Sequence, residues 1–168
     1  MNDSSYQVAR LGSTVFIRSV GLANMKNAPM LDSFLREVLA QGVLLVCVDL
    51  SCCSGMDSTF MGLLVGFSQE MAQVKGQLVV VNPTEQNLRL LNMLGVSEVL
   101  PVVARSSPTE LQFVVIPASP MVSPLQRLEI IKRAHQHLVE LNQTNVAKFS
   151  DFIEMLEEDL EKHRGKSL

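Results

Sequence analysis

The first part of the chain alternates between the hydrophobic period of a strand and that of a helix. Two short runs rich in β-branched and aromatic residues, 6–10 and 14–20, flank the turn residues at 11–13 and predict a β-hairpin. Apolar residues then recur at helical spacing between Pro29 and Gly42, which indicates a helix with one buried face. The almost uninterrupted apolar run at 42–50 predicts a central strand that is covered on both faces.

The residues that follow repeat this alternation. The small and polar residues at 51–56 predict a loop, and the apolar positions after it predict an amphipathic helix over 60–74. A strand over 77–81, a third helix over 84–94 and a last strand over 99–103 complete the pattern. The order β-β-α-β-α-β-α-β predicts an α/β fold in which helices cover a mixed β-sheet.

The density of charged side chains divides the chain in two. Residues 1–120 carry seven basic and nine acidic side chains, whereas the much shorter stretch 121–168 carries seven and eight. Prolines punctuate the junction, and proline disfavours a helix in the residue before it. We therefore expect a sheet domain at 1–104, a proline-containing linker at 105–124 with an edge strand near 111–117, and a C-terminal α-helical hairpin extension at 125–164.

Both helices of the expected hairpin carry an apolar stripe, and the NQTN sequence between them predicts a turn. The two stripes consist of Leu125, Leu128, Ile131, Ala134, Leu138 and Leu141, and of Val146, Phe149, Ile153, Leu156 and Leu160. An apolar stripe needs a partner that covers it. That partner is the other stripe, the sheet domain, or a second copy of the chain in a homodimer.

Composition narrows the range of functions. The 168 residues have a formal net charge of −3, which provides no basic field for a nucleic-acid backbone and argues against nucleic acid as the main partner. The start of the chain lacks the basic and apolar regions of a secretory signal, and the longest apolar run, 43–48, is too short to span a membrane. The adjacent pair Cys52 and Cys53 cannot form an ordinary disulfide. We therefore expect a cytoplasmic protein without a disulfide framework.

The sequence contains no recognisable catalytic or metal-binding motif. Its histidines all lie in the extension, and His135 and His137, two positions apart, point to different faces of a helix and predict exposed side chains. Gly62 and Gly66 lie inside the second helix, where they predict close packing of that helix on the sheet. These patterns predict that the chain is not an enzyme and needs no cofactor.

The sequence GMDSTFMG at 55–62 places hydroxyls and a carboxylate between the buried strand and the second helix. One interpretation is structural, because Asp57 or Ser58 can cap the free N–H groups of the helix. The other is regulatory, since a phosphoryl group on Ser58 would add roughly −1.5 to −2 charges at this point. Such a charge binds the helix dipole and opposes Asp57 and any acidic or apolar partner.

Several blocks of the sequence resemble the STAS domain of bacterial anti-sigma factor antagonists. They are VGL at 20–22, LLVCVDLS at 44–51, MDST at 56–59 and VVVNPTEQNLRLLNMLGVSEVLPV at 79–102, and the resemblance spans about residues 6–104. It implies that Ser58 is phosphorylated by a partner serine kinase of the histidine-kinase-like ATPase type, which is itself an anti-sigma factor. It also implies that a PPM phosphatase reverses this step and that Met56, Asp57 and Thr59 shape the loop.

Two positions depart from the family pattern. Phe60 stands where a glycine usually follows the serine pair, and Asn24 stands where an acidic residue commonly follows the second strand. Phe60 either shields Ser58 or forms part of the partner surface, and both positions bear on how a kinase recognises the loop.

The leading hypothesis is a non-enzymatic regulatory module whose partner affinity is set by phosphorylation of Ser58. In this hypothesis the helical hairpin adds dimerisation or a second interface. The alternative is a STAS-like structural subunit of a stress-signalling complex or lipid-transporter assembly, without phosphorylation. A third option, an enzyme with Ser58 as nucleophile, requires that His135 or His137 reaches the loop.

Overall fold

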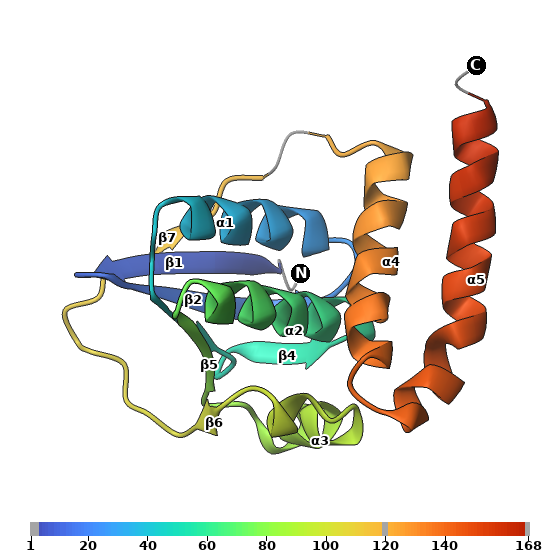
Figure 1. Ribbon diagram of the computed structural model, residues 1–168. Coiled ribbons are helices and arrows are strands. Elements are labelled where there is room, and N and C mark those ends of the chain that lie inside the picture. Colours follow the sequence, from blue (N-terminus) through green and yellow to red (C-terminus); the bar gives the residue numbers. More distant parts are fainter. Residues whose placement is uncertain (1–3, 119–120, 167–168) are drawn as a thin grey trace.

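A mixed seven-stranded β-sheet forms the centre of the protein, which the computed structural model describes over residues 4–118 and 121–166 (Figure 1). The strand order is β6-β5-β3-β2-β1-β7, with β4 paired to β2 outside this path. β1 (Ser5–Leu11) and β2 (Thr14–Ala23) form the predicted antiparallel hairpin. Their turn needs Gly12, whose φ of 60° is a conformation that glycine adopts without strain.

The parallel half of the sheet places the apolar run at its centre. β3 (Leu45–Asp49) pairs with β2 on one side and β5 (Gln77–Val81) on the other, and four of its five residues are buried. Helices α1 (Ala28–Ala40) and α2 (Ser58–Gln73) lie against the sheet (Figure 1). Their apolar faces join the strands in one hydrophobic core. The predicted α/β architecture with a mixed sheet is confirmed.

The segment at 51–56, which the sequence pattern assigned to a loop, contains a strand. β4 (Cys53–Met56) pairs in parallel with the end of β2, after an irregularity in register between Gly21 and Leu22. The strand is short and most of its residues are small, so no alternation marks it, and its conformation comes from pairing with β2. From α3 (Glu85–Met93), the Asn87 side chain donates a hydrogen bond to the Cys53 carbonyl at 2.9 Å.

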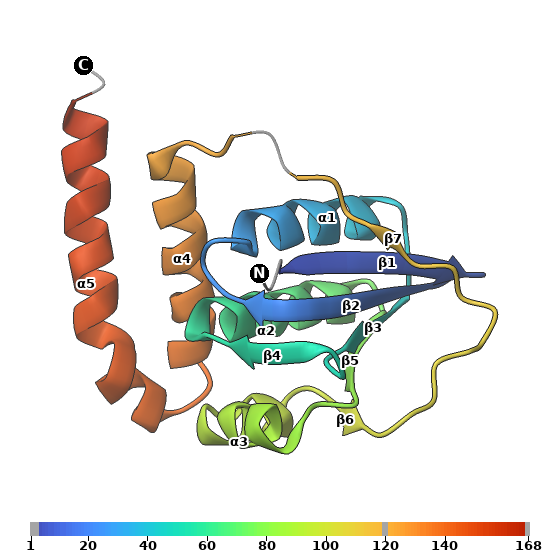
Figure 2. The same ribbon diagram turned by 180° about the vertical axis from the view of Figure 1, so that it is seen from behind.

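The last strands are shorter than their apolar runs. β6 comprises only Val102–Val103, because the chain before it forms the 3₁₀ helix η1 (Val96–Glu98) and then a turn. β7 (Val114–Val115) pairs antiparallel with β1, so the chain between β6 and β7 passes from one edge of the sheet to the other (Figure 2). Phe113 anchors this segment, because its ring lies 3.9 Å from the Arg18 guanidinium.

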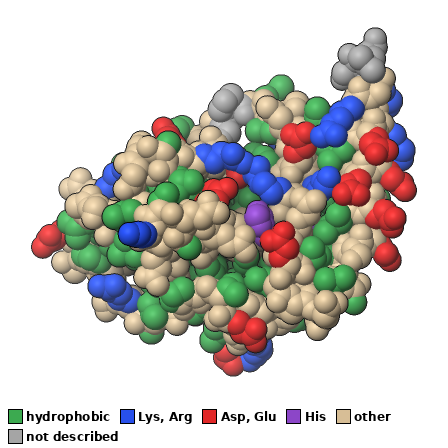
Figure 3. Space-filling model, in the orientation of Figure 1, with side chains coloured by type: hydrophobic (Ala, Val, Ile, Leu, Met, Phe, Trp, Pro, Cys, Tyr) green, Lys and Arg blue, Asp and Glu red, His purple; other side chains and the backbone are tan. Residues whose placement is uncertain are grey.

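The C-terminal helices form the predicted hairpin beside the sheet domain (Figures 1 and 2). α4 (Pro124–Val139) begins at a capping box of Ser123 and Gln126, and Asn142 caps α5 (Gln143–Gly165). The two apolar stripes face each other, and α4 also packs on α2, so this chain itself supplies a partner for both stripes. Acidic side chains crowd the outer side of α5 (Figure 3). In the described parts of the chain, no helix combines the length and apolar character that a membrane span requires.

Candidate functional site at the start of helix α2

Asp57 fixes the first turn of α2 to the loop between β2 and α1. One carboxylate oxygen accepts a hydrogen bond from the Phe60 N–H at 3.0 Å, and the other accepts from the Met25 N–H at 2.8 Å. Asp57 is therefore the N-cap of α2, as the structural interpretation of the sequence predicted. Both of its oxygens are engaged, and the carboxylate joins two segments that are far apart in the sequence.

The β2–α1 loop, residues 24–27, is held by its own side chains. Asn24 accepts a hydrogen bond from the Lys26 N–H at 2.9 Å, and its own N–H donates to the Asn27 side chain at 3.0 Å. The Tyr6 hydroxyl donates to the same Asn27 oxygen at 2.7 Å, and burial raises the pKa of Tyr6 well above its usual range. Asn24 thus supports the loop from within.

Ser58 is the first residue of α2, is partly exposed, and contacts a histidine 77 residues away in the sequence. Its Oγ lies 2.8 Å from Nε2 of His135 in α4, and Nδ1 of the same ring lies 2.7 Å from the Ile131 carbonyl. Because a carbonyl can only accept, Nδ1 carries a proton. In the neutral ring Nε2 is then an acceptor, and the Ser58 hydroxyl donates to it.

His135 is only 2% exposed, which corrects the expectation of an exposed helix histidine. The rings of Phe149 and Phe152 in α5 meet its imidazole edge to face, with centroids 5.1 and 4.8 Å away. A signal for this burial was present in the sequence, since His135 lies four residues after Ile131 and three before Leu138, next to the apolar stripe. The Ser58 partner itself is too distant in the sequence for any local pattern to show.

Burial lowers the pKa of His135 from its ordinary value of 6.5, and the hydrogen bond to the Ile131 carbonyl and the Asp57 charge oppose this shift only in part. The unfolded chain therefore binds a proton more readily than the folded one. Stability that depends on neutral His135 is fully present above pH 6.5 and is lost as the pH falls through the lowered pKa.

We expect the free energy of unfolding, measured with urea, to fall on acidification below pH 6.5 and to fall less in His135→Gln. Asp57 on α2 is the charged group that favours the protonated ring, while α5 places the rings of Phe149 and Phe152 against it. An equal decrease in both proteins would show that His135 does not carry the effect.

The two residues after Ser58 point into the protein. Thr59 is 2% exposed, and Phe60 is 1% exposed and stacks on Tyr6 with ring centroids 6.4 Å apart. Phe60 therefore belongs to the core, and its ring is not offered to a partner. Met56, on β4, is half-buried and packs against the same core.

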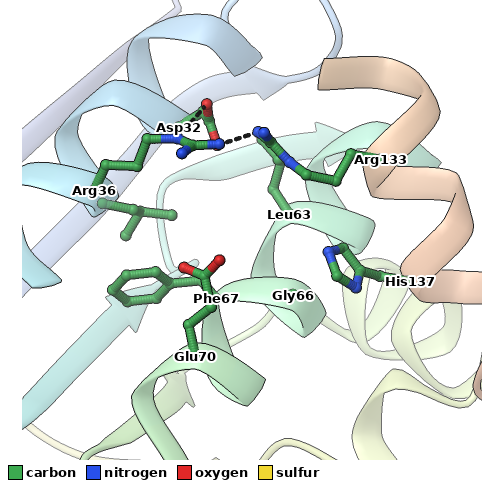
Figure 4. A pocket seen from close by; sticks show the side chains of 9 residues that line it. Asp32, Arg36, Leu63, Gly66, Phe67, Glu70, Arg133 and His137 are labelled. Carbon is green, nitrogen blue, oxygen red and sulfur yellow. Dashed lines mark hydrogen bonds and ion pairs between the residues drawn. The ribbon is translucent and has the colours of Figure 1, made fainter. Parts of the chain in front are cut away.

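Gly62 and Gly66 face α4, not the sheet as the sequence pattern suggested. A Cβ on Gly62 would lie 2.1 Å from the Ala134 carbonyl oxygen, and one on Gly66 would lie 2.5 Å from the His137 ring. Figure 4 shows His137 beside Gly66, and Arg133 of α4 reaching Asp32 of α1. The glycines thus let α4 approach α2 closely next to Ser58.

The chemistry available at this site is that of a hydroxyl, a carboxylate and an imidazole. In the described residues, no group of three or more histidine, cysteine or acidic side chains is arranged to hold a metal ion. What the site presents to solvent is the partly exposed Ser58 with Asp57 and the β2–α1 loop beside it.

The STAS domain profile matches residues 5–109, which end before the helical hairpin. A comparison with curated proteins finds no match. The anti-sigma factor antagonist SpoIIAA in its unphosphorylated form is 20% identical, with a TM-score of 0.57 over 61% of this chain and 90% of that chain. The phosphorylated form of the Bacillus cell fate determinant SpoIIAA is also 20% identical, with a TM-score of 0.53 over 61% of this chain and 93% of that one.

An anti-sigma factor antagonist from Mycobacterium paratuberculosis is 19% identical and has a TM-score of 0.55, over 61% of this chain and 86% of that chain. At these identities the solved structures show a shared fold. The profile match covers more than half of the sequence and includes β1 to β6, α2 and the Ser58 loop. The chain therefore belongs to the STAS domain family.

Proposed function

We propose that this protein is a non-enzymatic protein-binding module whose affinity for an anti-sigma factor is set by phosphorylation of Ser58. The anti-sigma factor is a serine kinase of the histidine-kinase-like ATPase type, and a PPM phosphatase reverses the reaction. Residues 1–104 form the binding module, 105–124 the linker and 125–164 a helical extension. The kinase transfers the γ-phosphoryl group of ATP to Oγ, the bond to ADP breaks, and the hydroxyl proton leaves.

The single observation that carries this proposal is the position of Ser58. Ser58 is a partly exposed residue at the N-terminus of a sixteen-residue helix, beside a loop that is fixed by hydrogen bonds. A helix N-terminus favours an anion, while the adjacent Asp57 carboxylate opposes one, so a phosphoryl group changes the local potential strongly. Likeness to a protein solved in both unphosphorylated and phosphorylated forms supports the same assignment.

The free energy that an added phosphoryl charge can supply suffices for a switch in partner affinity. Weakening a complex tenfold needs only about 1.4 kcal/mol. A charge placed against an unfavourable partner surface costs several kcal/mol, which exceeds that requirement. The module therefore needs no large rearrangement of its sheet domain to change partners.

Incubation of the purified protein with ATP and the cognate serine kinase should add one phosphoryl group by intact mass. We expect Ser58→Ala to abolish the gain, because the acceptor oxygen is absent. The matched control is Ser54→Ala, which removes an exposed serine hydroxyl from the neighbouring strand and should leave the gain unchanged. No gain in the unaltered protein, or a gain that survives Ser58→Ala, would remove Ser58 from this role.

The hydrogen bond between Ser58 and His135 favours a second candidate, a hydrolase with Ser58 as nucleophile and His135 as base. The imidazole is oriented by the Ile131 carbonyl, where a serine triad has a carboxylate. A fluorophosphonate probe distinguishes the two functions, since it labels an activated serine. We expect no labelling, and labelling that requires both Ser58 and His135 would favour the hydrolase.

A structural subunit without phosphorylation remains the other alternative from the sequence. Light scattering of the purified chain separates it from the switch. A large stable assembly would support the subunit, whereas the module should stay small until a partner is added.

A further inference from the structure

The α4–α5 hairpin contacts both Ser58 and the loop beside it. Arg127 of α4 donates hydrogen bonds to the carbonyls of Met25 and Lys26 in the β2–α1 loop, at 2.9 and 3.2 Å. His135 holds the Ser58 hydroxyl at 2.8 Å. The hairpin therefore lies on the site itself and restricts the approach of another protein from that side.

Helices α4 and α2 fit closely one turn along α2 from Ser58. The Ala134 carbonyl occupies the space that a side chain at position 62 would fill. A group added to the Ser58 oxygen must be accommodated next to this close contact. Protein interiors tolerate such additions only by moving one of the packed elements.

The interface between the hairpin and the body combines buried apolar contacts with polar ones. Ala134 joins Ala28 and Leu63 in an apolar cluster separate from the main core. Arg133 pairs with Asp32 at 2.7 Å beside a cavity of about 20 Å³, room for about one water molecule (Figure 4). The described residues between β7 and α4 form no helix or strand, so α4 can separate without breaking the sheet.

The hydrogen bond between Ser58 and His135 requires the hydroxyl form of Ser58. His135 accepts the hydroxyl proton at Nε2, since its other nitrogen donates to the Ile131 carbonyl. A phosphoryl group replaces this proton with a dianion, which then faces the imidazole lone pair. The Asp57 carboxylate lies at the same helix end and already holds the Phe60 N–H, so it adds repulsion.

We propose that the α4–α5 hairpin is a cover of the Ser58 site: docked, it holds the hydroxyl and hinders the kinase, and phosphorylation releases it. This inference rests on the proposed function. At equilibrium the coupling is reciprocal: the free energy by which docking disfavours the phosphorylated form equals the free energy by which phosphorylation disfavours docking. Release exposes the α2 face around Gly62 and Leu63 together with the inner stripe of α4, which provides a new apolar surface for a partner.

Phosphoserine installed at position 58 of the full chain during translation tests the release without any kinase. Hydrogen exchange followed by mass spectrometry should show amides of α4 exchanging about tenfold faster than in the unmodified protein, or ~1.4 kcal/mol. Amides of β3 should not change. Unchanged or slower exchange in α4 would overturn the proposal, the latter by showing that the phosphate holds the hairpin in place.

Gly62→Ala tests whether the docked hairpin hinders phosphorylation of Ser58. Its methyl group meets the Ala134 backbone and should displace α4, while alanine is the better helix former in α2. The matched control is Gly165→Ala in α5, where nothing lies within 4 Å of the new carbon. We expect faster α4 exchange and about tenfold faster phosphorylation of Ser58 in Gly62→Ala only.

The outcomes separate this inference from the function on which it rests. If α4 is displaced but Ser58 is phosphorylated at an unchanged or slower rate, the proposal that the hairpin covers the site is overturned, while Ser58 remains the acceptor. If the kinase modifies none of the proteins, the proposed function fails, and the phosphoserine protein still decides whether the hairpin is released. Faster exchange of β3 in Gly62→Ala would mean general unfolding, and the phosphoserine protein would again decide.

Discussion

Phe60→Ala is expected to lower the free energy of unfolding by about 3–5 kcal/mol, a large share of the stability of a domain of this size. Phe60 is 1% exposed and stacks on Tyr6, so its removal leaves a cavity between α2 and β1. Urea unfolding followed by circular dichroism measures the effect. The loss should be accompanied by faster amide exchange in β3, because that strand belongs to the same core.

Met93→Ala provides the matched control, since it shortens a large apolar side chain that is exposed on α3. We expect a change within about 0.5 kcal/mol for this variant. A small loss in Phe60→Ala would mean that the ring is not part of the core. Phe60 would then again be a candidate for the partner surface, as the sequence suggested.

Leu138→Ala is expected to cost about 2–5 kcal/mol, with the loss concentrated in the hairpin. Leu138 is fully buried where α4 meets the rest of the protein. Hydrogen exchange should therefore accelerate in α4 and α5 more than in β3. The exposed Met155 of α5 gives the control, because Met155→Ala removes a side chain of similar size without leaving a buried cavity.

Equal acceleration of exchange in β3 and the hairpin would contradict this expectation. It would show that the hairpin and the sheet domain unfold together as one unit. The cover would then have no separate opening step.

The fold could be predicted from the sequence because its signals are local. The apolar run that became β3 and the stripes of α4 and α5 each report burial through their own spacing. β4 was missed because its residues carry no such spacing and take their conformation from β2. Asp57 was predictable as an N-cap, since a cap acts within one turn of its own helix.

The contacts that close the site were not predictable in the same way. Spacing shows that Gly62 and Gly66 share one helix face, but not that this face meets α4. The bond from Ser58 to His135 joins residues 77 positions apart, and it depends on how the hairpin docks. Long-range placement is decided by the packing of whole elements, which the period of a single element does not encode.

The most direct test of a phosphorylation switch at Ser58 is the modification state of that residue in the cells that naturally make this protein. The affinity-purified chain would be digested, and the peptide that contains Ser58 quantified by mass spectrometry under growth and under stress. We expect Ser58 to carry a phosphoryl group in a fraction of the molecules, and this fraction should change between the two conditions. A peptide that stays unmodified in both, or carries its phosphoryl group on another residue, would contradict it.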